Sequence, residues 1–272
     1  MIFKRVMLSE EDGAYLDCYI ADPIKHFTRK AMLVIPGGGY GTVCSDREGE
    51  PIAQAFMPYG YNAFVLHYYV GKEKPFPIQL IQTAQAIRHI KDHAEEYGLD
   101  AEQLFVVGFS AGGHLAASTG VLWKHPAIYE AVDMPYGYNK PKGVMLIYPV
   151  ISATEPYCHL GSMYNLLATK EPSAQQCLAV SIEKHVDGDS APAFIMHTSN
   201  DQIVDVRNSL ALGAAYREAE LQFEMHIYPD SPHGAALGNA ITAWNNEKYN
   251  NPAIAEWVRM AAAWADSLPD TQ

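Results

Sequence analysis

Short apolar runs alternate with helical stretches along most of the chain, and this alternation limits the fold more than any other feature. The predicted strands are the apolar runs at 31–35, 62–66, 104–107, 144–148, 193–197 and 223–228. The predicted helices are the stretches at 51–57, 78–97, 111–122, 205–218 and 252–267. Strands that are apolar on both faces are typical of a parallel sheet covered by helices on both sides. We therefore predict an α/β fold with a mainly parallel central sheet.

Three segments depart from this alternation. Residues 15–20 predict an antiparallel strand at the edge of the sheet, whereas 124–142 and 151–190 fit neither pattern well. We interpret 151–190 as an insertion of short helices over the carboxyl ends of the strands, where ligands of such sheets bind. No internal repeat or Pro/Ser-rich linker divides the chain. We predict one domain, 1–272, with a small cap insertion at about 151–190.

The composition of the chain limits the classes of molecule that it is expected to bind. A formal net charge of −12 disfavours nucleic acid and anionic membranes as partners. No run approaches ~20 apolar residues, and no apolar run follows Lys4 and Arg5 as a secretory signal requires. The four cysteines are scattered and form no C-x-x-C pair, which indicates free thiols rather than a disulfide or zinc framework. We expect a cytoplasmic protein without a metal, and we leave a homo-oligomer open.

One serine has the setting of a nucleophile. Ser110 lies at the centre of a G-x-S-x-G motif, between the strand at 104–107 and the small-residue helix at 111–122. A sharp strand-to-helix turn raises the serine Oγ above the sheet, and the flanking glycines avoid a collision across that turn. The amino end of the helix favours a developing oxyanion. The alternative is a tight turn with an inert serine, and the setting favours a catalytic Ser110.

A run of three glycines follows the strand at 31–35. Without side chains, its backbone N–H groups can approach the carbonyl oxygen of a substrate. The run lacks the Gly-Lys-Ser/Thr ending of a P-loop and does not complete G-x-G-x-x-G. A plain flexible turn is the remaining alternative. With the serine turn downstream, we predict an oxyanion hole formed by Gly38, Gly39 and the backbone N–H of Ala111.

A serine nucleophile needs a histidine base, and that base needs a carboxylate to orient it. In this type of fold the chain order is serine, acid, histidine. His233 lies in a loop after the last predicted strand, which makes it the predicted base. His197 and His226 lie inside predicted strands and are expected to pack in the sheet. His114, one turn beyond Ser110, is expected to support the site.

The loop after the strand at 193–197 offers two carboxylates. Asp201 lies at the tip of this loop and is the predicted acid of the triad. Asp205 precedes a helical pattern, so it is also a candidate helix N-cap. We favour Asp201 and keep Asp205 as the alternative.

At this point the motifs resemble a known family, the acetyl-xylan-esterase-like branch of the α/β-hydrolase superfamily, close to bacterial carbohydrate esterases and the BD-FAE group. The resemblance covers roughly 30–263. It rests on the segments 36–40, 45–51, 108–116, 196–204 and 231–234. It implies an α/β-hydrolase fold with Ser110, Asp201 and His233 as the triad. Asp205 stands where such sequences usually have proline.

The resemblance also implies a function: a serine carboxylic-ester hydrolase (a carboxylesterase or acetylesterase) that acts on short acyl esters, often acetyl groups on sugars or xylo-oligosaccharides. The expected partner is thus a small-molecule ester, an acylated carbohydrate, and no cofactor is required. The stretch Asp46, Arg47 and Glu48 is a candidate to bind substrate hydroxyls, or it belongs to a solvated, ion-paired loop that fixes the glycine run. Tyr40 either lines the pocket or packs. The rival functions are a serine peptidase of prolyl-oligopeptidase type and a non-catalytic binding protein on the same scaffold.

Overall fold

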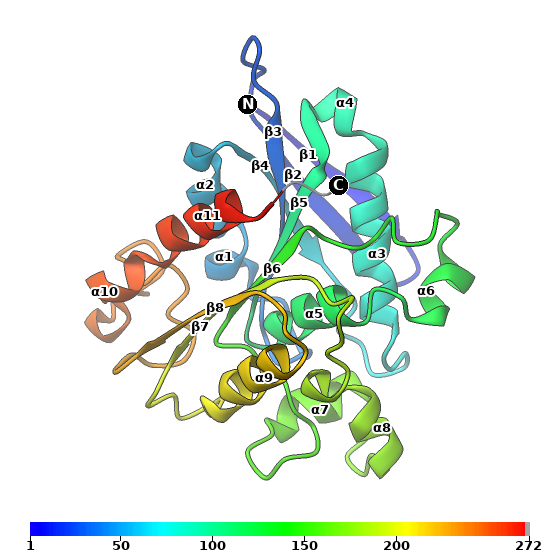
Figure 1. The fold of residues 1–272 in the computed structure, drawn as a ribbon, viewed down its shortest axis with the longest axis vertical. Coiled ribbons are helices and arrows are strands. Elements are labelled where there is room, and N and C mark those ends of the chain that lie inside the picture. The colour runs from blue at the N-terminus through cyan, green and yellow to red at the C-terminus, as the bar shows by residue number, and fades with distance from the viewer. Residues whose placement is uncertain (270–272) are drawn as a thin grey trace.

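The computed structural model describes residues 1–269, and within them the predicted strands join one eight-stranded sheet (Figure 1). The strands are β1 Ile2–Ser9, β2 Ala14–Ile20, β3 Arg29–Ile35, β4 Tyr61–His67, β5 Leu99–Phe109, β6 Gly143–Ile147, β7 Ala193–Thr198 and β8 Phe223–Tyr228. Their order is β1-β2-β4-β3-β5-β6-β7-β8. Strands β3 to β8 run parallel, while β2 is antiparallel to both of its neighbours. The predicted mainly parallel sheet is confirmed.

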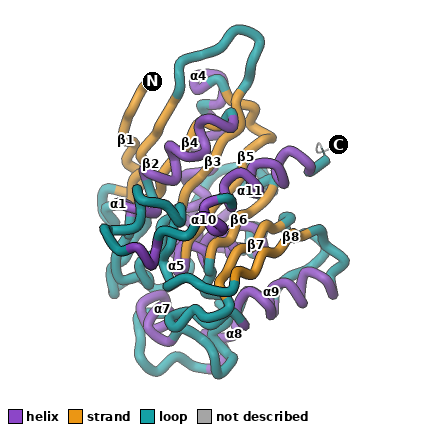
Figure 2. Tube along the Cα trace, turned by 90° about the vertical axis from the view of Figure 1, so that its left-hand side faces the viewer, coloured by secondary structure: helices purple, strands orange, loops and turns teal. Residues whose placement is uncertain are grey.

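Helices cover both faces of this sheet (Figures 1 and 2). One face carries α1 Ser45–Glu48, α2 Glu50–Phe56, α10 Pro252–Ala255 and α11 Trp257–Ser267. The other carries α3 Ile78–Asp92, α4 Ala94–Tyr97, α5 Ser110–Val121, α6 Pro126–Ala131 and α9 Arg207–Glu218. Neighbouring strand residues point to opposite faces, so Met32 and Leu33 belong to two separate buried clusters. Two apolar layers therefore hold the sheet from both sides.

The prediction of an edge strand at 15–20 is wrong in one respect. The strand exists as β2, but β1 lies outside it and forms the edge. No residue of β1 is fully buried, and Lys4 and Arg5 interrupt its apolar residues, so the strand has no continuous apolar run. Arg5 forms two hydrogen bonds with the carboxylate of Asp17 on β2, at 2.7 and 2.9 Å. Pairing with β2 rather than burial holds this strand in place.

The predicted helix at 78–97 is divided in two at His93. His93 lies between the end of α3 at Asp92 and the start of α4 at Ala94. Its ring Nδ1 lies 2.8 Å from the carbonyl oxygen of His89. Gly98 ends α4 in a left-handed conformation, with a φ of 63°. Among residues 1–269, no helix is both long enough and apolar enough to cross a membrane.

The segment 151–190 contains short helices and lies beside α5 and α9 (Figure 1). These helices are α7 Leu160–Leu166, α8 Ala174–Ala179 and the 3₁₀ turn Ile182–Lys184. Two contacts tie the segment to neighbouring elements. The Asn165 side chain donates to the carbonyl oxygen of Gly39 at 2.9 Å, and the His114 ring bonds the carbonyl oxygen of Val180 at 2.8 Å. The division into one domain and a cap stays a prediction.

Candidate active site

Ser110 stands at the junction of β5 and α5 in a strained conformation. Its φ is 52°, a left-handed value that is rare for residues other than glycine. The turn is tight enough to require the flanking glycines. A Cβ on Gly108 would lie 2.2 Å from the carbonyl oxygen of Gly112, and one on Gly112 would lie 2.2 Å from that of Ile35. The two glycines therefore allow the backbone to hold the serine hydroxyl at the carboxyl end of the sheet.

The histidine and the carboxylate predicted downstream reach this serine in a continuous chain of hydrogen bonds. His233 Nε2 lies 2.9 Å from Ser110 Oγ, and His233 Nδ1 lies 2.6 Å from Asp201 Oδ2. A carboxylate can only accept, so Nδ1 carries a proton and Nε2 is left to accept from the serine hydroxyl. The arrangement has the geometry of a nucleophile, a base and an orienting acid.

Asp201 is held as an ionised carboxylate. Burial alone would raise its pKa, but hydrogen bonds with the rings of His197 and His233 and with the backbone N–H of Val204 hold the pKa well below its usual range. Its second oxygen accepts from the N–H groups of Ile203 and Val204 at 2.9 and 3.0 Å. The side chain is fully buried. Asp201 thus presents a fixed negative charge to His233.

The structure separates the two candidate acids. Asp205 forms an ion pair with Arg207, with Oδ2 and Nη2 2.6 Å apart, and it accepts from the Arg207 backbone N–H at 2.9 Å. That second bond satisfies a free N–H at the start of α9, as expected of a residue near a helix N-terminus. The bonds of its two oxygens are to Arg207 rather than to His233. The geometry favours Asp201 over Asp205.

His197 also contacts the acid, although the sequence suggested only a packed position in the sheet. Its Nδ1 lies 2.7 Å from Ser209 Oγ, and its Nε2 lies 2.9 Å from the carbonyl oxygen of Val204. A carbonyl oxygen only accepts, so Nε2 carries a proton. The same nitrogen lies 3.3 Å from Asp201 Oδ2. His197 therefore contacts the same carboxylate oxygen as His233.

The glycine loop presents free backbone donors near the serine. Gly38 and Gly39 have φ values of 124° and 63°. A Cβ on Gly38 would lie 2.2 Å from the carbonyl oxygen of Thr42, so this position requires glycine. Within residues 1–269, the N–H groups of Gly38 and Gly39 have no acceptor. The N–H of Ala111 lies in the first turn of α5, where intrahelical acceptors are lacking.

The buried carboxylate of Glu48, which favours the loop-fixing alternative for this residue, connects the glycine loop with the histidine loop. Glu48 accepts from the backbone N–H of Gly37 at 2.8 Å and from the Tyr148 hydroxyl at 2.9 Å. The same hydroxyl accepts from the N–H of Ala236 at 3.0 Å. The Tyr148 ring packs edge-on against His233, with centroids 4.9 Å apart. Glu48 and Tyr148 thus connect the glycine loop with the loop that carries His233.

Arg47 and Asp46 have different surroundings: Arg47 contacts other residues, whereas Asp46 is exposed. Arg47 donates to the carbonyl oxygen of Gly234 at 2.8 Å, and its guanidinium lies 3.8 Å from the ring centre of Trp244. This contact favours the loop-fixing alternative for Arg47, although it fixes the residue after His233 rather than the glycine run. Asp46 is exposed on α1 and remains a candidate for substrate contact.

Tyr40 packs, because its side chain is 1% exposed. Its hydroxyl lies 2.8 Å from Nδ1 of His114, whose Nε2 bonds the Val180 carbonyl oxygen. The carbonyl fixes the proton of His114 on Nε2, so Tyr40 donates to Nδ1. Burial lowers the pKa of His114 to about 4. This neutral chain joins the glycine loop, α5 and the segment 151–190.

A pH dependence of stability follows from His114. Its pKa is about 4 in the folded protein and about 6.5 in an unfolded chain. The unfolded state therefore binds the proton more readily, so the free energy of unfolding falls by about 3 kcal/mol as the pH falls from 6.5 to 4. In urea titrations, the stability difference between wild type and His114→Gln is expected to shrink by that amount from pH 7 to pH 4. An equal difference at both pH values would contradict the buried neutral ring.

No group of three His, Cys, Asp or Glu side chains within the described chain, 1–269, is placed to hold a metal ion. The four cysteines, all described, are unpaired.

Comparisons with known proteins find one matching family model and several similar proteins. The BD-FAE family model matches residues 16–216. Endo-1,4-β-xylanase B of Butyrivibrio fibrisolvens is 35% identical over 232 residues, which cover 82% of this chain and 35% of that protein. The acetylxylan esterase of Xylanibacter ruminicola is 26% identical over 238 residues, covering 85% of this chain and 45% of that protein. The chain thus spans less than half the length of these curated relatives.

A solved structure extends the likeness over nearly the whole chain. The acetyl ester-xyloside bifunctional hydrolase of Caldicellulosiruptor lactoaceticus is 31% identical, with a TM-score of 0.80 over 94% of this chain and 88% of that one. The family match covers both the glycine loop and the serine turn. The chain therefore belongs to the BD-FAE family and has the α/β-hydrolase fold.

Proposed function

We propose that this protein hydrolyses short acyl esters, in particular the acetyl esters of sugars or xylo-oligosaccharides, through an acyl-enzyme on Ser110. The observation that carries the proposal is the hydrogen-bonded chain Ser110–His233–Asp201 beside the free N–H groups of the glycine loop. That the chain is an esterase-type hydrolase follows from its family and its similarity to named esterases.

In the first half of the reaction, Ser110 Oγ attacks the ester carbonyl carbon while His233 Nε2 takes the hydroxyl proton. Asp201 stabilises the imidazolium that forms. The carbonyl oxygen becomes an oxyanion, for which Gly38, Gly39 and Ala111 supply backbone donors. One such donor contributes about 3 kcal/mol to the transition state by precedent. His233 then gives its proton to the leaving alcohol.

In the second half, water attacks the acyl-enzyme by the same route. His233 takes a proton from the water, the oxyanion forms again, and Ser110 leaves with the proton. The buried Asp201 keeps the ring in one tautomer through both halves. We propose Glu48 and Tyr148 as positioning residues, since their hydrogen bonds hold the glycine loop and the histidine loop in register.

The substrate class rests on the names of the relatives, which include an acetylxylan esterase and an acetyl ester-xyloside hydrolase. A small-molecule ester is accordingly the expected partner, and an acylated carbohydrate is the proposed one. A cytoplasmic location is proposed from the four scattered, unpaired cysteines, since reduced thiols are typical of that compartment. Recovery of the protein from the medium of the producing cells, rather than from their lysate, would contradict that location.

A substrate panel tests the proposal. Acetate release from acetylated xylo-oligosaccharides is expected at a kcat/KM of ~10⁴ M⁻¹s⁻¹ or more, with slower hydrolysis of feruloyl and octanoyl esters. The measurement is a pH-stat or coupled acetate assay on each substrate. Faster cleavage of a peptide amide than of any ester would favour the prolyl-oligopeptidase type of activity instead.

A further inference from the structure

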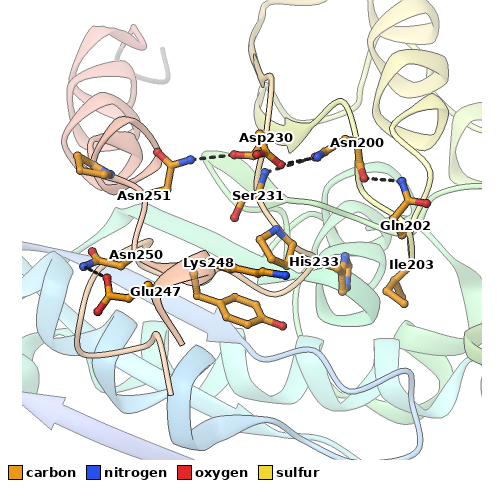
Figure 3. A pocket seen from close by; sticks show the side chains of 13 residues that line it. Asn200, Gln202, Ile203, Asp230, Ser231, His233, Glu247, Lys248, Asn250 and Asn251 are labelled. Atoms are coloured by element: carbon orange, nitrogen blue, oxygen red, sulfur yellow. Dashed lines mark hydrogen bonds between the residues drawn. The ribbon is translucent and has the colours of Figure 1, made fainter. Parts of the chain in front are cut away.

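A cavity of about 650 Å³ adjoins His233 on the side of the acid loop (Figure 3). Its walls come from three segments, 200–203, 230–233 and 247–252. His233 thus belongs both to the hydrogen-bonded chain with Ser110 and to the wall of this cavity.

We propose that this cavity is the subsite for the leaving alcohol and that it accepts a neutral polyhydroxylated alcohol, a sugar ring. The inference rests on the proposed ester hydrolysis. His233 Nε2 must give its proton to the alkoxy oxygen of the ester, so this oxygen has to lie next to the imidazole. The alcohol attached to it then extends past His233, where the cavity offers room.

The wall has the chemistry that hydroxyl groups require. It contains an ammonium group on Lys248, carboxylates on Asp230 and Glu247, and amides such as Gln202. Hydroxyls both donate and accept, so they can use all of these groups. Two carboxylates against one ammonium disfavour an anionic alcohol. An apolar alcohol would leave these polar groups without partners, at a cost in binding.

Two groups of the wall are free to bind. Within residues 1–269, neither the Lys248 ammonium nor the Tyr249 hydroxyl has a hydrogen-bond partner. Figure 3 shows Lys248 extending across the cavity toward His233 and Ile203. The Gln202 amide donates to the Asn200 carbonyl at 2.7 Å, and this leaves its own oxygen as an acceptor.

The rest of the wall is a scaffold with an apolar part. Asp230 accepts from the side chains of Asn200 and Asn251, which ties the three segments together. Ile203 is 57% exposed, and the Tyr249 ring is half-buried. These surfaces suit the C–H faces of a sugar ring, which alternate with its hydroxyls. Donors, acceptors and apolar surface are thus combined as a polyol requires.

The test compares two acetyl esters that form the same acyl-enzyme. Methyl acetate has an alcohol too small to reach the cavity, whereas the alcohol of an acetylated xylo-oligosaccharide would fill it. We expect Lys248→Ala and Gln202→Ala to raise KM for the oligosaccharide ester by about fivefold or more. Methyl acetate hydrolysis should stay within about twofold of wild type, since it does not use these side chains.

Lys25→Ala is the matched control, because Lys25 is exposed in the loop before β3, at the opposite end of the sheet from the site. It should change neither substrate. Calorimetry with the deacetylated xylo-oligosaccharide supplies a readout that does not depend on turnover. Binding to wild type and to Lys25→Ala is expected, with at least a fivefold weaker affinity for Lys248→Ala.

The outcomes separate this inference from the proposed function. Equal losses on both esters would mean that Lys248 and Gln202 act through His233, and the subsite would be overturned. Unchanged kinetics and unchanged oligosaccharide affinity in both variants would overturn it as well. If wild type hydrolyses neither ester, the proposed function fails, and the calorimetric comparison alone then decides whether the cavity binds sugar.

Discussion

Ser110→Ala is expected to lower kcat/KM for acetyl esters by a factor on the order of 10⁵, which leaves the activity close to background. The reason is that the variant has no nucleophile, while His233 and the backbone donors remain. The loss should appear in kcat, because the binding surfaces for substrate are unchanged. Initial rates with methyl acetate and an acetylated xylo-oligosaccharide measure it.

The fold of this variant should persist. Removal of the hydroxyl loses one hydrogen bond to His233, so the unfolding free energy should change by no more than about 1.5 kcal/mol. Ser118→Ala is the matched control on the same helix, since its Oγ is also buried and bonds the carbonyl oxygen of His114. The control should lose a similar stability and keep its activity. Substantial activity in a folded Ser110→Ala protein would refute the nucleophile.

The second large effect concerns the acid. Asp201→Asn is expected to lower kcat by about 10⁴-fold, as the loss of the orienting carboxylate does in other serine hydrolases. An asparagine amide turned toward His233 donates to Nδ1, which moves the ring proton to Nε2 and removes the base. The same amide N–H₂ would also face the protonated Nε2 of His197, so two donors would stand opposite each other without an acceptor. A kcat measurement with methyl acetate suffices.

Asp205→Asn provides the comparison that decides the acid. Asp205 bonds Arg207 on the surface of α9, so the variant should lose less than about 1 kcal/mol of stability. Its kcat should stay within about twofold of wild type, because the bonds of its carboxylate are to Arg207. If Asp205→Asn loses more activity than Asp201→Asn, the acid has been misassigned.

Much of the fold could be predicted from the sequence because the central strands are buried on both faces. Such strands appear as continuous apolar runs, and β3 to β7 all have this character. Strand β1 lacks it, since none of its residues is fully buried and it is paired on one side only. The break at His93 depends on a side-chain bond to the backbone of His89 and has no compositional signal.

The candidate triad could be located because each member follows a strand and the chain order is set by the fold. The burial of Glu48 and its partnership with Tyr148 could not be predicted in the same way. Glu48 stands in a run of charged residues that is typical of a solvated loop, yet it is 2% exposed. Its burial depends on Tyr148, one hundred residues away, and on the backbone N–H of Gly37. Such long-range partners leave no local pattern in a single sequence.

Tyr40 and Arg47 illustrate the same limit. Their position beside the glycine loop is compatible with substrate contact as well as with packing. The structure favours packing only because His114 and Gly234 lie within hydrogen-bond distance. Both partners come from distant parts of the chain, so a tertiary structure is needed to distinguish the two roles.

Covalent labelling of the nucleophile tests the central claim most directly. A fluorophosphonate reacts with an activated serine hydroxyl, whose oxygen displaces fluoride at phosphorus and forms a stable adduct. Intact-mass and peptide measurements should find one adduct per chain, on Ser110, at the same rate at which esterase activity disappears. An adduct on another residue, or full activity after complete labelling of Ser110, would contradict the account.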